Sequence, residues 1–154
     1  MPEKILRNTF TVPASAAAAY EHLIRPENYI GLSPLVVAVE DVQEDSYIAV
    51  ERFRLLTPKY DNRIRVSLQG TPGKAVWGEV NSPGGVHMAY HFDLTPTPAG
   101  TQVDDELRLR TPFGLMTFAS GQARKVQLAR ARILTERLTR SRSRSSREPF
   151  AAGP

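Results

Sequence analysis

Six segments rich in β-branched and aromatic residues follow one another along the middle of the chain, and only short turns separate them. The turns, such as GTPG, NSPGG and TPTPAGT, carry the Gly, Pro and Asn residues that reverse a chain tightly. Connections this short join neighbouring antiparallel strands, because a parallel crossover needs about a dozen or more residues. The sequence therefore predicts an antiparallel meander with strands at 35–42, 46–56, 60–70, 74–81, 85–94 and 101–110.

Helices are expected on either side of this meander. A strand at 4–12 precedes an alanine-rich helix within 12–23, and a short helical turn within 25–34 follows. After the last strand, Pro112 opens a long helix over 112–138, whose apolar stripe is weak in the middle because small residues replace bulky ones there. A helix with small side chains where it crosses a sheet either packs very close to the sheet or leaves a space between the two.

Two stretches of the chain resemble a known family, the START/Bet v 1-like (SRPBCC) superfamily of the polyketide cyclase/dehydrase and lipid-transport type. FTVPASAAAAYEHLIRPENYIGLSPLVVAV is similar to its strand, helix, proline break and next strand, and YHFDLTPTPAGTQVDDEL to its penultimate hairpin. The resemblance covers roughly residues 4–138. It implies an α+β helix-grip fold, in which a curved seven-stranded antiparallel sheet wraps around the long C-terminal helix. It also implies a cargo such as a lipid, sterol, plant hormone or polyketide.

Charge is distributed unevenly along the 154 residues. Residues 1–123 carry 11 Lys and Arg against 14 Asp and Glu, whereas residues 124–147 carry nine basic residues against Glu136 alone. We expect a single helix-grip domain at 1–139 and a disordered, solubilising Ser/Arg-rich tail at 140–154. Because no aromatic residues are interleaved with the arginines, nucleic acid is not an expected partner.

The composition and the absence of several motifs narrow the possible functions. The chain has no cysteine, so it has neither a thiolate metal site nor a cysteine nucleophile. The N-terminus lacks the apolar core of a signal peptide and no run reaches transmembrane length, so we expect a cytoplasmic protein without membrane insertion. Phosphate-binding loops, nucleophile elbows and histidine-rich ligand spacings are missing too. We therefore expect no cofactor and no metal. The protein is expected to be a monomer or a homodimer.

The alternation of side chains along each strand predicts which of them face the helix. In GVHMAYHFDL the apolar residues share one face, so His87 and His91 face solvent. The same parity carries Glu51, Asn62 and Asp105 inward. Taken singly, each fits a strand end in water or beside an arginine better than a buried position. Taken as a set they predict an open, partly hydrated cavity, because a closed apolar core does not tolerate unpaired carboxylates.

The facing of KAVWGEVN stays open. Two arrangements are possible, with either Val76, Gly78 and Val80 or Ala75, Trp77 and Glu79 facing inward. A tryptophan is rarely left on a wet sheet face, which favours the second arrangement. Gly78 facing inward would instead leave room for a ligand.

These observations predict a binding protein first. Its expected ligand is a hydrophobic or polycyclic aromatic small molecule, lipid-like or polyketide-like, held in an internal cavity for carriage, sensing or sequestration. The residues expected to contact the ligand are Phe53, Tyr60, Asn62, Ile64, Val66, Trp77, Met88, Tyr90, Phe92, Leu107, Met116 and Phe118. The middle strands offer no inward arginine of the kind expected in the cyclases of this superfamily, which ranks catalysis below binding.

Two other functions are weighed against binding. A cofactor-independent aromatic polyketide cyclase/dehydratase would use Asp105, Glu51 and Glu79 as acid/base groups, with a tyrosine hydroxyl stabilising the enolate. Alternatively, the basic tail would bind nucleic acid or a protein. Tail binding would survive mutation of the cavity and fail at high salt, whereas cavity functions would do the reverse.

Overall fold

The computed structural model describes residues 2–53, 60–82 and 84–147, with Phe53, Tyr60 and 142–147 described by their backbone alone. In chain order its elements are β1 (Glu3–Val12), α1 (Ala16–Leu23), the 3-10 helix η1 (Pro26–Tyr29), β2 (Val36–Glu40), β3 (Ser46–Phe53), β4 (Tyr60–Ser67), β5 (Gln69–Thr71), β6 (Ala75–Ser82), β7 (Val86–Thr97), β8 (Gly100–Arg110) and α2 (Met116–Arg147). Apart from β5, this order of strands and helices is the one that the sequence predicts.

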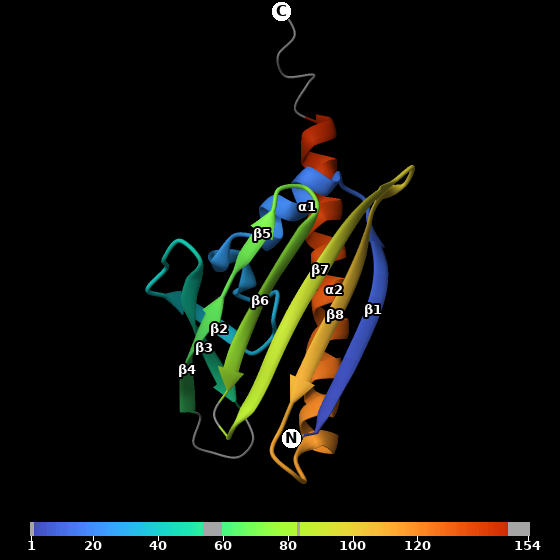
Figure 1. Ribbon diagram of the computed structural model, residues 1–154. Coiled ribbons are helices and arrows are strands. Elements are labelled where there is room, and N and C mark those ends of the chain that lie inside the picture. Colours follow the sequence, from blue (N-terminus) through green and yellow to red (C-terminus); the bar gives the residue numbers. More distant parts are fainter. Residues whose placement is uncertain (1, 54–59, 83, 148–154) are drawn as a thin grey trace, which may run out of the picture.

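The strands form one antiparallel sheet of eight strands among the described residues. They pair in the order β1-β8-β7-β6-β4-β3-β2, and the short β5 pairs with β6. The first strand pairs along its whole length with the last, from Glu3 opposite Arg110 to Val12 opposite Thr101. The sheet curves around α2, which lies against its concave side (Figure 1). This architecture confirms the helix-grip prediction, with one strand more than expected.

The additional strand arises at Ser67, where the predicted strand 60–70 divides into β4 and β5. At this point hydrogen bonds that involve a side-chain hydroxyl replace the regular backbone pairing of the sheet. The Ser67 hydroxyl accepts the Glu79 amide at 2.7 Å, and the Ser67 carbonyl accepts the Tyr90 hydroxyl at 2.6 Å. Backbone pairing with β6 resumes at Gln69, which lies opposite Trp77.

Helix α1 lies at the end of the sheet toward which α2 runs, and α2 continues beyond it (Figure 1). Ser15 caps α1, since its hydroxyl accepts the Ala18 amide at 3.1 Å, and the alanine run behind it favours a helix. Ala19 and Leu23 are fully buried against the sheet. The Leu23 carbonyl accepts the Tyr29 hydroxyl at 2.7 Å, which joins η1 to α1. This end of the interior is therefore closed.

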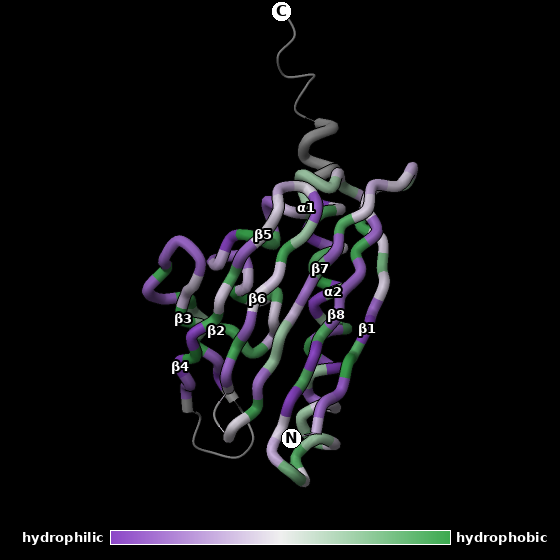
Figure 2. Tube along the Cα trace, viewed as in Figure 1, coloured by the Kyte–Doolittle hydropathy of each residue, from purple (hydrophilic) through white to green (hydrophobic). Residues whose placement is uncertain are grey.

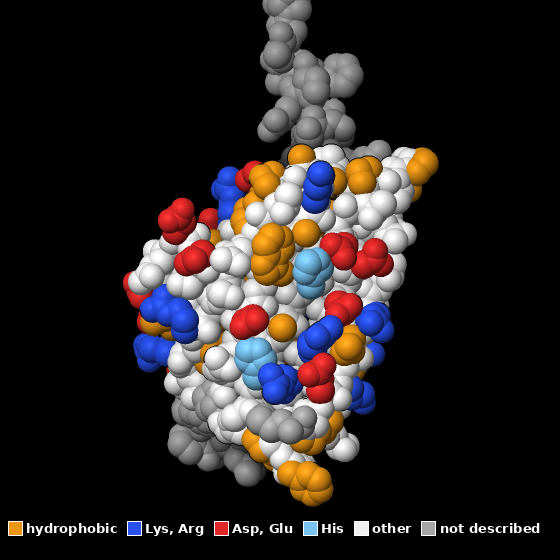
Figure 3. All heavy atoms as spheres, in the orientation of Figure 1, with side chains coloured by type: hydrophobic (Ala, Val, Ile, Leu, Met, Phe, Trp, Pro, Cys, Tyr) orange, Lys and Arg blue, Asp and Glu red, His pale blue; other side chains and the backbone are white. Residues whose placement is uncertain are grey.

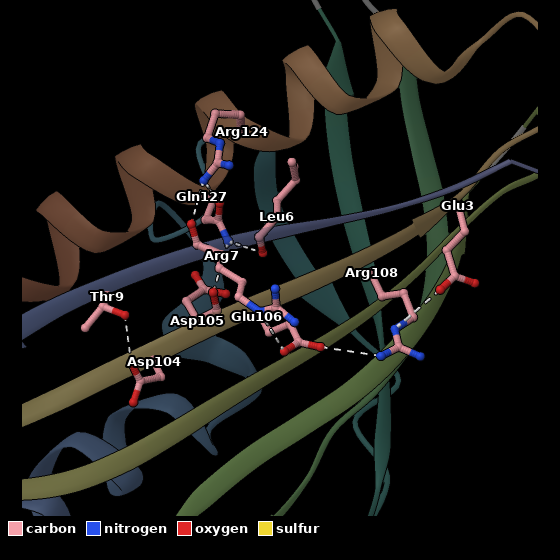
Figure 4. A network of polar contacts seen from close by, with 10 residues as sticks. All are labelled: Glu3, Leu6, Arg7, Thr9, Asp104, Asp105, Glu106, Arg108, Arg124 and Gln127. Carbon is pink, nitrogen blue, oxygen red and sulfur yellow. Dashed lines mark hydrogen bonds and ion pairs between the residues drawn. The ribbon is translucent and has the colours of Figure 1, made fainter.

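Helix α2 presents a narrow face of small and polar side chains to the sheet. Its buried residues are Ser120, Ala123, Gln127, Arg130, Ala131, Leu134 and Leu138. Gln127 donates to the backbone carbonyls of Leu6 and Asp105, at 3.2 and 3.3 Å, and Arg124 donates to that of Arg7 at 2.8 Å (Figure 4). These bonds hold α2 close to β1 and β8, as its small side chains allow.

The backbone of α2 continues past the predicted domain boundary at 139/140 and reaches Arg147. The backbone over 140–147 is thus described as helix, within the stretch for which the composition predicts a disordered tail. Arginine is a good helix former, serine is tolerated, and neither Gly nor Pro interrupts the chain before Pro149. Residues 148–154 lie outside the described part, and the division into domain and tail stays a prediction.

Hydrophobic and hydrophilic residues alternate along β7 and β8 (Figure 2). On β8 the buried positions are Thr101, Val103, Asp105, Leu107 and Leu109. On β7 the apolar residues Tyr90, Phe92 and Leu94 belong to the same core. The inward face of these strands thus carries a single carboxylate, that of Asp105, among mostly apolar side chains.

Candidate functional site

Asp105 and Arg130 form an ion pair in the interior, between β8 and α2. Asp105 lies opposite Phe92 on one neighbouring strand and opposite Asn8 on the other, and it is 1% exposed. Arg130 is 8% exposed, and its Nη2 lies 2.9 Å from Asp105 Oδ2. Its guanidinium also lies over the Phe92 ring, 4.8 Å from the ring centre. The inward facing of Asp105 follows the alternation of β8.

The sequence did not single out Arg130, although a signal for it exists. Helical periodicity allows either Ala129 or Arg130 to continue the buried face of the helix, and arginine usually prefers solvent. An inward carboxylate, however, needs a counter-charge. Arg130 lies on the same buried helix face as Gln127 and Leu134, three and four residues away.

The ion pair affects the pKa of Arg130. Burial alone would lower the pKa of Arg130, but the Asp105 carboxylate outweighs that effect and the pKa of Arg130 is raised. Burial also raises the pKa of Tyr29, Tyr47 and Tyr90, and the nearby Arg130 guanidinium offsets part of each rise. These three tyrosines are therefore neutral phenols that surround a buried guanidinium.

The tyrosines of the interior differ in what their hydroxyls do. The Tyr29 and Tyr90 hydroxyls donate to the backbone carbonyls of Leu23 and Ser67. The Tyr47 ring stacks on that of Tyr29, with 6.2 Å between ring centres. Its hydroxyl makes no side-chain hydrogen bond to a residue that the structure describes. Among the described residues, Tyr47 is thus the one of the three tyrosines whose hydroxyl has no hydrogen-bond partner.

Strand β6 settles the facing that the sequence left open. Val76, Gly78 and Val80 face inward, and Gly78 is paired with Tyr90. A side chain at Gly78 would place its Cβ 2.0 Å from the Ser67 carbonyl oxygen and 2.4 Å from the Tyr90 hydroxyl. Gly78 therefore makes room for the Tyr90 ring, and the space it leaves is already filled.

Trp77 and Glu79 consequently lie on the outer face, so the inward arrangement favoured from the sequence is wrong. Trp77 stacks on His91 with 6.0 Å between ring centres and donates from Nε1 to Gln69. Its apolar surface is covered by a neighbour on the sheet face, which is why the tryptophan is stable there. Glu79 is exposed, and its carboxylate lies 3.9 Å from the His87 ring.

At the end of the sheet opposite α1, several inward-facing side chains are only half-buried. They are Glu51, Asn62, Val86, Met88 and Met116. Glu51 and Asn62 lie opposite each other on β3 and β4, and burial raises the pKa of Glu51. Solvent thus reaches a mixed apolar and polar lining at this end, which we name the open end.

The other residues expected to contact a ligand fall into three groups. Ile64, Val66, Tyr90, Phe92 and Leu107 are buried in the core. Phe118 is 58% exposed on α2, so its expected place in the interior is wrong. The side chains of Phe53 and Tyr60 lie outside the described residues.

The outer face of the sheet carries the charged groups (Figure 3). His87 and His91 lie there, as the alternation of β7 predicts, and His91 pairs with Asp93 at 2.9 Å. The described residues include no group of three or more His, Asp or Glu that could hold a metal ion. Within the same part of the chain, no helix is long and apolar enough to cross a membrane.

Comparison with known proteins places the fold. No family model matches the sequence, and no curated protein matches it. Solved structures do match. A START superfamily protein from Mycobacterium smegmatis superposes with a TM-score of 0.74 at 11% identity, over 88% of this chain and 97% of that one. The chain has the START/Bet v 1-like helix-grip fold.

Of two further structures with this fold, one is named as an enzyme and the other only as a conserved protein. The Zhui aromatase/cyclase from Streptomyces sp. R1128 matches with a TM-score of 0.71 at 15% identity, over 90% of this chain and 95% of that one. A conserved protein from Geobacillus kaustophilus matches with the same TM-score at 17% identity, over 90% and 97% of the two chains. At such identities the START/Bet v 1-like likeness is one of fold alone.

Proposed function

We propose that the protein binds a hydrophobic or polycyclic aromatic small molecule between the concave face of its sheet and α2. The observation that carries this proposal is the open end, where Met88, Met116 and Val86 face inward and are still half-buried. In a closed core these apolar side chains would be covered, because burying them is favourable. A ligand that covered them would gain the same free energy.

Glu51 and Asn62 suit the same role. They are the polar members of the open-end lining, and they would orient a ligand whose remaining surface is apolar. Whether the protein carries, senses or sequesters its ligand depends on what that ligand is.

Calorimetric titration of lipids, sterols and polycyclic aromatics tests the proposal. The decisive variants are Met88→Trp and Ala89→Trp, which add the same side chain to opposite faces of β7. Met88→Trp would fill the open end and weaken binding at least about tenfold, whereas Ala89→Trp would leave it unchanged. Equal effects of the two variants, with both proteins folded by circular dichroism, would refute binding on the concave face.

A cyclase or dehydratase is the second candidate, and the raised pKa of Glu51 favours it. A carboxyl group that holds its proton closer to neutral pH is better suited to proton transfer. Asp105 is held by Arg130 and Glu79 lies on the outer face, so Glu51 is the one of the three proposed acid/base groups with a suitable position.

Mass spectrometry of the bound molecule separates the two candidates. A ligand that returns lighter by one water would identify a dehydratase or cyclase, and Glu51→Gln would then stop turnover while binding is kept. A ligand that returns with its mass unchanged would identify a binding protein.

A further inference from the structure

Half of the exposed large apolar side chains that the structure describes lie in one short segment. Such side chains occur at six described positions, and three of these fall within 113–118, at Phe113, Leu115 and Phe118. Phe113 is 96% exposed, so it covers no part of the core. Single apolar residues on a surface are ordinary, whereas a group of them marks a surface that contacts a partner. The segment 113–118 therefore calls for a partner.

This segment joins the sheet to α2 at one end of the molecule (Figure 1). Gly114 has a φ of 89°, a conformation that favours glycine, and it turns the chain from β8 towards α2. Figure 3 shows hydrophobic side chains at the same end of the surface. In the first turn of α2, Met116 packs against the core at the open end, whereas Phe118 is exposed to solvent. The exposed apolar group thus lies next to the open end.

The charge around this segment has one sign. Residues 107–135 contain six Lys and Arg and no Asp or Glu. Three of the six are paired with carboxylates, namely Arg108, Arg130 and Arg132. Arg110 and Lys125 are exposed and pair with no carboxylate that the structure describes, and the same holds for Lys4 of β1. Glu3, beside Lys4, is the carboxylate that Arg108 contacts. Unpaired positive groups therefore surround the exposed apolar side chains.

This combination restricts what covers the surface. A second copy of the chain that used the same surface would bring like charges together, which is unfavourable. A lipid bilayer with anionic head groups presents negative charge directly above an apolar layer. Such a bilayer complements both the basic groups and the apolar side chains, so the charge pattern favours it over a second copy.

We propose that the start of α2 and the turn before it dock on the surface of an anionic lipid bilayer. Phe113, Leu115 and Phe118 enter the boundary between head groups and acyl chains, and the unpaired basic groups contact the lipid phosphates. The contact is one with the bilayer surface, so it differs from the insertion of a membrane-spanning helix. Because Met116 lies in the same segment, docking would bring the open end to the lipid.

Sedimentation with vesicles tests the proposal on the full, unaltered chain. One kind of vesicle is pure phosphatidylcholine, and the other contains about 30% phosphatidylglycerol, which is anionic. We expect at least about tenfold tighter binding to the anionic vesicles at low salt, and loss of that binding in about 0.5 M NaCl, because salt screens exposed charges. Equal binding to the two kinds of vesicle, or no binding, would overturn docking. Neither result would affect the proposed ligand binding inside the half-barrel.

Matched variants test whether this surface makes the contact. Phe118→Ser and Val42→Ser each remove an apolar side chain that is more than half exposed, but Val42 lies in the turn between β2 and β3. Phe118→Ser should weaken binding to anionic vesicles at least about threefold, and Val42→Ser should leave it unchanged. Lys125→Gln should weaken it similarly, and Lys74→Gln, in the turn between β5 and β6, should not. Equal effects within both pairs would overturn the proposal.

The Ser/Arg-rich segment is a rival for the same vesicles, because it also carries unbalanced positive charge. The triple variant Arg142→Gln/Arg144→Gln/Arg147→Gln removes most of that charge. In this background Phe118→Ser is expected to weaken binding by the same factor as in the unaltered chain. Loss of all vesicle binding in the triple variant, together with no effect of Phe118→Ser in the unaltered chain, would assign the contact to the tail and overturn the proposal.

Fluorescence locates the contact. The chain has one tryptophan, so Phe113→Trp in a Trp77→Phe background leaves a single tryptophan at position 113. Lipids brominated along the acyl chain quench a tryptophan that enters the bilayer, and we expect them to quench this one. Val42→Trp in the same background should not be quenched. Equal quenching of the two tryptophans, or none at position 113, would contradict the proposed geometry.

Sedimentation equilibrium without lipid tests the second copy as the alternative occupant. We expect Phe113→Ser to leave the mass of the protein in solution unchanged. A dimer of the unaltered chain that Phe113→Ser dissociates would show that the apolar group is a contact between two copies, and this result would overturn docking on lipid.

Discussion

Asp105 is the residue on which the interior depends most. A carboxylate that is 1% exposed is stable in an apolar core because Arg130 reaches it from α2. The alternation of β8 predicts the facing of Asp105 from the sequence alone. Its partner could not be predicted in the same way, because helix periodicity allows Ala129 and Arg130 equally, and only the packed helix decides between them.

Replacing Arg130 with leucine should destabilise the protein by about 3–5 kcal/mol, since it leaves the Asp105 carboxylate buried and unpaired. The double variant Asp105→Leu/Arg130→Leu should recover much of that loss, because it removes both charges. Urea denaturation at neutral pH measures both free energies of unfolding. A double variant no more stable than Arg130→Leu would show that the ion pair is not what stabilises Asp105.

Gly78→Ala should destabilise the fold by about 1–3 kcal/mol, because its Cβ would overlap the Ser67 carbonyl and the Tyr90 hydroxyl. Tyr90→Phe would remove the second contact and leave the first, so the loss should persist in that background. As a control, Gly121→Ala on the exposed part of α2 meets nothing within 4 Å and should stabilise the helix by up to about 1 kcal/mol. Thermal melts of the variants would contradict this account if Gly78→Ala were neutral.

Glu51 should make stability depend on pH. Burial raises its pKa above the usual 4.5, so the folded protein holds this proton to a higher pH than the unfolded chain does. Stability from this group is therefore present below pH 4.5 and is lost as the pH rises through the raised value. Glu51→Gln should be more stable than the wild type at pH 7 and equal to it near pH 4. A constant difference between the two proteins in urea titrations at both pH values would contradict this.

At the scale of elements, α2 holds η1 through Arg137. This side chain donates to the carbonyls of Asn28 and Ile30, at 2.7 and 2.9 Å, and its Nη1 lies 3.2 Å from His22 Nε2. A long basic side chain on a helix usually stays in solvent, so the sequence gives no reason to expect these contacts of Arg137. Its contacts join segments that are distant in the chain, and periodicity carries no information on those.

His22 should weaken this junction in acid. Burial, followed by the charge of Arg137, lowers the pKa of His22 below the usual 6.5. The unfolded chain therefore takes up a proton near pH 6.5 that the folded protein resists, so stability is lost as the pH falls below that value. His22→Gln, which can still accept from Arg137, should flatten the change in unfolding free energy between pH 7.5 and 5. An unchanged slope would show that another group is responsible.

Strand patterns predict more of these elements than helix patterns do. The two-residue period of β7 and β8 places His87, His91 and Asp105 on their correct faces. Alternation alone leaves two facings of β6 open, and the preference of tryptophan for burial favours the wrong one. The correct facing is fixed by Gly78, whose inward position makes room for Tyr90 on the neighbouring strand. Gly78 and Tyr90 contact each other across neighbouring strands, so the sequence of either strand alone does not predict the contact.

At the scale of the whole molecule, the fold follows from the order of elements, and the proposed site is the open end, where inward side chains stay half-buried. Helix α2 is held to β1 and β8 by Gln127 and Arg124, and α1 closes one end. The opposite end keeps Glu51, Asn62 and Met88 half-buried. The sequence predicts a cavity, but it does not predict which inward residues stay half-buried, because that depends on how these elements pack.

The outer position of Trp77 decides how ligand binding should be measured. A change in tryptophan fluorescence would report on the outer face, where Trp77 stacks on His91. The two interior methionines, Met88 and Met116, are better reporters, because both face inward at the open end.

The most direct test is therefore an NMR titration of protein labelled with methyl-13C-methionine and 15N-tryptophan, using 1,8-dihydroxyanthraquinone as the probe. Binding inside the half-barrel predicts saturable shifts of the Met88 and Met116 methyl signals and an unchanged Trp77 indole signal. A shift of the Trp77 indole with unchanged methyl signals would place the ligand on the outer face and contradict the account.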